Sequence, residues 1–273
     1  TPTHAAFSRA YNRIPVRTTF YQPEPIRNFD WTALMNSRLP SARRWLAAQR
    51  AQAVDVIRNA MALTGRETDP ATYLDARSLR LFDLERGLAV AIFGMTPERQ
   101  MVLESYVGFT LFKNGLPAAY GGAWVLGERA SFGMNIFEAY RGGESGYMMC
   151  QVLRVYRQVF GVRYFEVDAH QFGLDNPDGI ATGAFWFYYR LGFRPLDPRA
   201  AQRAEDAWAR MRADPGQRTP IGELRRFTGS DIELRLHALP ECEPGVLSDA
   251  VTRWIGRVFD GDRAMAEHAA TRL

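Results

Sequence analysis

The stretch Tyr140-Arg141-Gly142-Gly143-Glu144-Ser145-Gly146 lies between a segment typical of a strand and a segment with helical periodicity. Residues 130–137 precede it, and the apolar residues that follow recur every three or four positions as far as Gly161, a suitable C-cap. A strand that ends in a glycine-rich turn and opens a helix directs several backbone N–H groups at one point, where the helix dipole favours an anion. The pattern predicts a phosphate-binding turn, although an ordinary turn looks the same.

The residues of this turn include some that favour phosphate binding and one that opposes it. Its three glycines lack the Cβ atoms that would keep phosphate oxygens at a distance, and Arg141 supplies a positive charge. Glu144, in contrast, brings a carboxylate close to the predicted anion unless its side chain points away. The direction of Glu144 therefore decides whether the turn can bind a phosphate.

Strand signals also occur upstream of the turn. Residues 107–112 and 117–126 flank Asn114-Gly115, and an Asn-Gly pair supplies the two positive-φ positions of a tight hairpin turn. Residues 87–93 form a further apolar run of strand length. We expect these segments to pair as neighbouring antiparallel strands.

The next strand is predicted over residues 163–169, downstream of the helix. Strand alternation places Glu166, Asp168 and His170 on one face. That face is either a polar wall of an active site or the solvent side of an edge strand. His170 titrates nearest neutrality of the three, which makes it a candidate general base.

The segments on either side of this sheet have helical patterns. Residues 1–40 are rich in proline and aromatic residues and predict an extended arm, and a helical stripe follows with Ser41 as its candidate N-cap and Gly65 as its candidate stop. After Pro198 the chain is expected to be helical again. The predicted organisation is an N-terminal arm and helical extension (1–85), a central mixed-sheet core (86–197) and a C-terminal helical extension (198–273).

A second motif lies about 45 residues beyond the turn, where residues 184–193 read Ala-Phe-Trp-Phe-Tyr-Tyr-Arg-Leu-Gly-Phe. Together with residues 137–142 it resembles the signature of the GNAT superfamily of acyl-CoA N-acyltransferases. The resemblance covers about 110 residues and implies an α/β (α+β) fold, with a central mixed, mainly antiparallel twisted sheet flanked by helices. The chain departs from the family pattern at Glu144, at Ala181 and in the long loop over residues 171–179.

The resemblance implies direct acyl transfer from acyl-CoA, acetyl-CoA or a longer thioester, to an amine-type acceptor. A variant of this function uses an acyl carrier protein as the donor, because the pantetheine arm is common to both and only the nucleotide contacts differ. The acceptor is expected to be a small molecule or a peptide. The alternative is a non-catalytic module of the same fold that binds a CoA-like ligand or a protein partner, and Glu144 is the feature that favours it.

The resemblance also implies roles for individual residues. Tyr188 matches the family's tyrosine acid, and a phenol is well suited to protonate a departing thiolate; its other interpretation is a core aromatic residue. The base candidates are Glu138, Glu166, Asp168 and His170. The residues expected to contact the cofactor are Ile136, Phe137, Glu138, Arg141, Gly142, Gly143, Ser145 and Gly146.

The overall composition fits an ordinary globular protein, with 47% hydrophobic and 23% charged residues. The formal charge of +4 arises from scattered arginines, and Lys113 is the only lysine, so nucleic-acid binding is not expected. Two cysteines, Cys150 and Cys242, and the lack of a run of ~20 apolar residues favour a cytoplasmic protein without a membrane span. The four histidines lack metal-ligand spacing, so no metal is expected, and a homodimer is left open.

Overall fold

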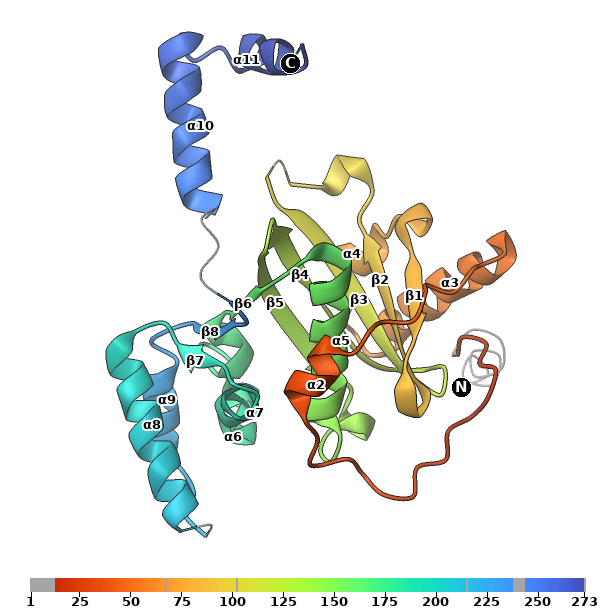
Figure 1. Ribbon diagram of the computed structural model, residues 1–273, viewed down its shortest axis with the longest axis vertical. Helices are drawn as coiled ribbons and strands as arrows, with labels where there is room; N and C mark the ends of the chain where they lie inside the picture. The colour runs from red at the N-terminus through yellow and green to blue at the C-terminus, as the bar shows by residue number, and fades with distance from the viewer. Residues whose placement is uncertain (1–12, 67, 102, 215, 238–243, 273) are drawn as a thin grey trace.

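The computed structural model describes residues 13–66, 68–101, 103–214, 216–237 and 244–272, and within them eight strands form one open sheet (Figure 1). Their order is β1-β2-β3-β4-β5-β6-β8-β7, and every neighbouring pair is antiparallel except β5 and β6. Helices flank this mixed, mainly antiparallel sheet, which confirms the predicted fold class. The strands are β1 (Arg80–Asp83), β2 (Leu88–Gly94), β3 (Ser105–Lys113), β4 (Leu116–Leu126), β5 (Arg129–Ile136), β6 (Tyr164–Val167), β7 (Arg194–Pro195) and β8 (Ile232–Arg235).

The predicted hairpin is confirmed between β3 and β4. Asn114 and Gly115 form its turn with φ angles of 50° and 82°, the left-handed values that this residue pair adopts readily. The register runs from Lys113 opposite Leu116 to Ser105 opposite Val125. This long pair forms the centre of the sheet.

The parallel pairing of β5 and β6 is short. Only residues 129–131 of β5 pair with residues 164–166 of β6, whereas β5 continues to Ile136. The strand predicted over 163–169 is shorter than expected because β6 ends at Val167, and Asp168 caps a 3-10 helix, η5 (Ala169–Phe172). Strand β5 therefore extends beyond its pairing with β6.

One face of the sheet is covered by the helix that follows the glycine-rich turn. This helix, α5 (Ser145–Phe160), ends as predicted at Gly161, whose φ is 75°. The short helix α2 (Trp31–Asn36) packs along α5, so part of the predicted extended arm is helical. Arg154 of α5 is fully buried and donates hydrogen bonds to the carbonyl oxygens of Ser37 and Arg38, which joins the two elements.

The aromatic motif at residues 184–193 begins with a short helix, α7 (Ala184–Arg190). Another short helix, α6 (Pro177–Thr182), precedes it. Gly183 separates them with a φ of 65°, a left-handed conformation that ends the first helix. Both belong to the apolar core that also contains α5.

The opposite face of the sheet is covered by α3 (Ala47–Leu63) and α4 (Asp69–Thr72). The apolar stripe of α3 is buried against β1 and β2 as expected, but Ser41 is not its N-cap. The helix begins six residues later, after Leu46, because the intervening segment runs in extended form and Arg43 donates its backbone N–H to the carbonyl oxygen of Leu81 in β1.

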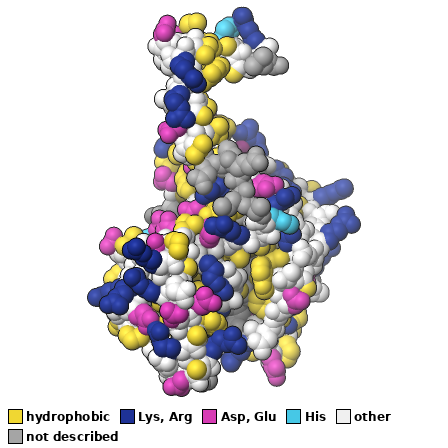
Figure 2. Space-filling view, turned by 60° about the vertical axis from the view of Figure 1, so that its left-hand side comes forward, with side chains coloured by type: hydrophobic (Ala, Val, Ile, Leu, Met, Phe, Trp, Pro, Cys, Tyr) yellow, Lys and Arg dark blue, Asp and Glu magenta, His cyan; other side chains and the backbone are white. Residues whose placement is uncertain are grey.

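The C-terminal part contributes to the sheet as well as to the helices. After α8 (Pro198–Ala213) and α9 (Ile221–Phe227), β8 inserts between β6 and β7, a strand that the sequence pattern did not indicate. Helices α10 (Pro244–Val258) and α11 (Arg263–Ala270) lead away from the sheet and carry exposed apolar side chains (Figures 1 and 2). Among the described residues, no helix has the length and apolar character needed to cross a membrane.

Candidate functional site

The glycine-rich turn joins the free end of β5 to the first residue of α5. Beyond Phe137 the chain forms a 3-10 turn, η4 (Glu138–Tyr140), and then passes through Gly142 and Gly143, whose φ angles are 90° and 35°. Both values lie in the left-handed region, which glycine adopts at little cost. Ser145 closes the turn, since its backbone N–H donates to the carbonyl oxygen of Gly142 at 3.0 Å and its hydroxyl accepts from the N–H of Gly142 at 3.2 Å.

Four backbone N–H groups remain unpaired at the start of α5. Within the described ranges, the amides of Gly143, Glu144, Gly146 and Tyr147 donate to no protein acceptor. Backbone donors near a helix start are free to bind an external anion, and the helix dipole adds positive potential there. The turn thus has the donors that a phosphate group requires.

The carboxylate of Glu144 is directed to groups outside the turn. Its oxygens lie 3.1 Å from the guanidinium of Arg86 and 3.2 Å from the ammonium of Lys113, and one of them accepts the backbone N–H of Ile26 at 3.3 Å. Burial would raise the pKa of Glu144, but these hydrogen bonds and the charge of Lys113 outweigh it and lower the pKa. The negative charge is therefore compensated, and it does not oppose an anion at the turn.

The N-terminal arm runs beside the same turn. Pro25 lies close to Gly143, because a Cβ built on that glycine would be 3.1 Å from Pro25 Cβ. Phe29 packs edge-on against Tyr147, with ring centroids 5.3 Å apart. Because Ile26 is bonded to Glu144, the arm forms one wall of the turn.

A cavity of about 270 Å³ adjoins the turn at the end of β5. It brings together four residues that the sequence predicted for the site, namely Ile136, Phe137, Glu138 and Arg141. Sequence reasoning missed its other lining residues, because they lie in the loop after α3 and at positions of β4 and β5 without a motif. These residues are Thr64, Arg66, Tyr120 and Asn135. Glu138 is exposed to solvent, and the Nε of Arg141 donates to the carbonyl oxygen of Ile136 at 3.0 Å.

Tyr188 lies in the aromatic core on α7 and does not line this cavity. Its side chain is 3% exposed and packs against the rings of Phe172 and Phe193, at centroid distances of 6.4 and 5.6 Å. Burial raises the pKa of Tyr188, so the phenol stays protonated at neutral pH. Its hydroxyl forms no hydrogen bond with any residue that the structure describes.

The other base candidates do not share one strand face as the alternation predicted. Glu166 stays in β6 and pairs with Arg129 at 2.8 Å. Asp168 caps η5 by accepting the N–H of His170 at 2.7 Å. His170 is exposed, and its Nδ1 lies 2.8 Å from the carbonyl oxygen of Leu174. Because β6 ends at Val167, the side chains of residues 168 and 170 follow the geometry of a 3-10 turn instead of a strand.

The cysteines and the possible metal ligands remain to be placed. Cys150 is buried, and burial raises the pKa of its thiol to about 12. Cys242 lies outside the described residues. In the ranges that the structure covers, no group of three or more His, Cys, Asp and Glu residues could hold a metal ion.

Few known proteins are similar to this chain. No family of known proteins and no curated protein matches the sequence. Two solved structures, a cAMP-binding acyltransferase from Mycobacterium smegmatis and a point mutant of it, align with 75% of this chain at 12% and 11% identity, with TM-scores of 0.30 and 0.32. The alignments span 58% and 59% of those longer chains. The fold assignment therefore rests on the strand order and the turn described above.

Proposed function

We propose that the protein transfers an acyl group from acyl-CoA to an amine-type acceptor. The observation that carries the proposal is the set of four unpaired amides at the start of α5, combined with the ion pairs of Glu144 to Arg86 and Lys113 outside the turn. An uncompensated carboxylate at this position would oppose a diphosphate. With that charge neutralised, the residues present fit the phosphate groups of CoA.

The diphosphate would be held by the amides of Gly143, Glu144, Gly146 and Tyr147, with Arg141 supplying charge at the rim. The thioester would then extend along the end of β5, beyond its pairing with β6. An acyl carrier protein could present the same pantetheine arm, but it would lack the nucleotide part of CoA.

In the proposed reaction the acceptor nitrogen attacks the thioester carbonyl carbon. The C–N bond forms, the C–S bond breaks, the amine proton passes to a base, and the leaving thiolate takes a proton from an acid. Glu138 lines the cavity beside the turn and is the base candidate best placed among those described. Tyr188 is the acid candidate, and because burial raises its pKa the phenol is protonated at neutral pH.

The proposal is tested by measuring thiol release from acetyl-CoA and longer acyl-CoAs in the presence of a panel of amines. We expect Tyr188→Phe to lower kcat by about 10²-fold or more while KM for acyl-CoA stays similar, as for a lost general acid. Equal kcat for wild type and Tyr188→Phe would remove Tyr188 from the mechanism. No thiol release with any donor and acceptor would contradict acyl transfer itself.

A second candidate function is binding of a CoA-like ligand without turnover. The burial of Tyr188 favours it, because its hydroxyl is bonded to no described residue and Tyr188 does not line the cavity beside the turn. CoA binding without thiol release would select this function over catalysis.

A further inference from the structure

A second cavity lies away from the glycine-rich turn, between the α6–α7 pair and the loop that joins α8 to α9. Its volume is about 460 Å³, and it adjoins another of about 660 Å³ that shares Ile180, Ala181 and Ile221 with it. Both volumes lie in the range usual for small-molecule sites. None of the residues assigned to the proposed acyl-transfer site lines either cavity.

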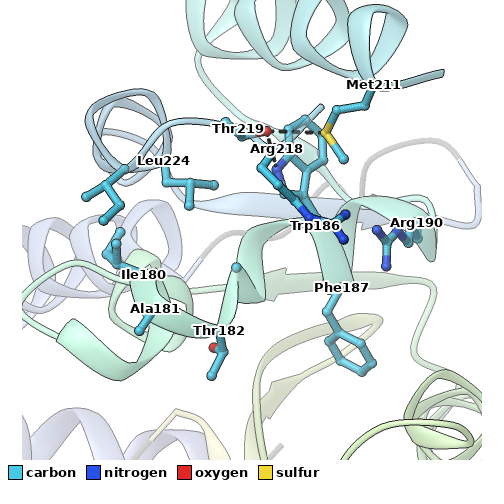
Figure 3. Close-up of a pocket in the computed structure, with 12 residues that line it drawn as sticks. Ile180, Ala181, Thr182, Trp186, Phe187, Arg190, Met211, Arg218, Thr219 and Leu224 are labelled. Atoms are coloured by element: carbon cyan, nitrogen blue, oxygen red, sulfur yellow. Dashed lines mark hydrogen bonds between the residues drawn. The ribbon is translucent and has the colours of Figure 1, made fainter. Parts of the chain in front are cut away.

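The first cavity has a basic end and an apolar end. Figure 3 shows Arg190 on one side of Trp186, Ile180 and Leu224 on the opposite side, and Arg218 next to Thr219 and Trp186. Neither arginine forms an ion pair with any residue that the structure describes. Guanidinium groups without an ion-pair partner at one end and apolar side chains at the other are complementary to a ligand with an anionic end and an apolar end.

The walls of this cavity are fixed by contacts between elements. The indole N–H of Trp186 donates to the hydroxyl of Thr219 at 2.9 Å, and that hydroxyl lies 3.2 Å from the sulfur of Met211 (Figure 3). These bonds anchor the loop that carries Arg218 to α7. The loop at the basic end is thus held against α7, and Arg190 and Arg218 are exposed and accessible to a ligand.

The second cavity continues the apolar end. Ile221 stands at the boundary between the two with 58% of its surface exposed, and Leu174 of the second cavity is 45% exposed. The second cavity also contains one arginine, Arg225, and one carboxylate, Asp175, whose charges offset each other. The positive charge available to an anion therefore lies in the first cavity.

We propose that these adjoining cavities bind an amphipathic carboxylate, a molecule with a single carboxylate and an extended apolar chain. The carboxylate lies between Arg190 and Arg218. The chain crosses Trp186 toward Ile180 and passes Ile221 into the second cavity. This site is separate from the glycine-rich turn and does not depend on acyl transfer.

The test is calorimetric titration of the full chain with decanoate, at concentrations where decanoate does not form micelles. A parallel titration with decanol, which has the same chain length and no charge, is the control. We expect decanoate to bind at least tenfold more tightly than decanol, and Arg190→Gln combined with Arg218→Gln to remove that difference. Arg203→Gln, which changes the same charge on α8 outside both cavities, should bind decanoate as the wild type does. Equal affinity for decanoate and decanol would overturn the proposal, as would unchanged decanoate binding in the double variant.

Two further measurements keep the result unambiguous. If the double variant does not fold, as judged by the loss of its melting transition, Arg218→Gln alone replaces it, because Arg218 is exposed. This single variant should bind decanoate severalfold more weakly than the wild type. A repeat of the titration with saturating CoA identifies the site. Unchanged decanoate affinity supports a separate site, whereas competition by CoA would place the arginines in the cofactor site and overturn the assignment.

Discussion

Glu144 shows how a single side chain changes the meaning of a motif. Its position in the sequence puts a carboxylate inside a predicted phosphate turn, yet in the folded chain the carboxylate is bonded to Arg86, Lys113 and the backbone of Ile26. These partners are 58, 31 and 118 residues away along the chain. No local pattern could have predicted them, because the sequence motif determines only which residues are neighbours along the chain.

Replacement of Glu144 by Gln is expected to destabilise the protein at pH 7 by roughly 1–3 kcal/mol, because two partly buried cations lose their partner. The pKa of Glu144 is lowered in the folded state, so its contribution is fully present above the unfolded pKa, about 4.3, and is lost as the pH falls through the folded pKa. The difference between wild type and variant should therefore shrink below about pH 4.

Urea unfolding of both proteins from pH 7 to pH 3 measures this difference. Glu24→Gln is the matched control, because its side chain is exposed and only its backbone carbonyl contacts Arg86. A variant difference that stays constant down to pH 3 would contradict the ion-pair account of Glu144.

Two buried tyrosines should respond differently to the loss of a hydroxyl group. The hydroxyl of Tyr156 donates to the carbonyl oxygen of Val107 at 2.5 Å, whereas that of Tyr188 bonds to no described residue. We expect Tyr156→Phe to cost about 1–2 kcal/mol and Tyr188→Phe to cost less than about 0.5 kcal/mol. Chemical denaturation of the two variants decides it, and an equally large loss for Tyr188→Phe would mean that its hydroxyl has a partner in solution.

At the scale of elements, long segments with strong local signals were predictable and short ones were not. The Asn114-Gly115 hairpin and the helix that ends at Gly161 follow from turn and capping chemistry within a few residues. The end of β6 at Val167 was not predictable from alternation, because the cap formed by Asp168 competes with strand pairing. This one competition moved His170 off the predicted strand face.

The centre of the sheet also constrains the sequence at Gly121 of β4. A Cβ at Gly121 would lie 2.1 Å from the carbonyl oxygen of Gly133 in the neighbouring strand, which is backbone and cannot easily move aside. Gly121→Ala is therefore expected to destabilise the protein by about 1–3 kcal/mol. Gly222→Ala in α9, where a Cβ meets open space, should be neutral or stabilising by up to about 1 kcal/mol. Thermal melts of both variants provide the check, and an unchanged melting temperature for Gly121→Ala would contradict the described β4–β5 contact.

At the scale of the whole molecule, the fold class was predictable, but the route of the chain was only partly so. Strand β8 has only four residues, and its place between β6 and β7 depends on pairing across a long insertion that contains α8 and α9. The candidate site was predictable where it lies on contiguous sequence, as in the glycine-rich turn. Arg66 and the arm residue Pro25 were not predictable, because folding brings them to the turn from distant segments.

The central claim, that the turn at the head of α5 binds the phosphate groups of CoA, is tested most directly by calorimetric titration of CoA into wild type, Gly146→Asn and Gly146→Asp. A side chain at Gly146 meets only ordinary contacts, 3.6 Å to Leu191 and 4.0 Å to Phe29, and an acid in the first turn of a helix does not destabilise it. We predict that wild type and Gly146→Asn bind CoA, and that Gly146→Asp binds it at least about tenfold more weakly, because the added carboxylate repels the diphosphate. Absence of CoA binding to the wild type, or equal affinity in Gly146→Asn and Gly146→Asp, would contradict the account.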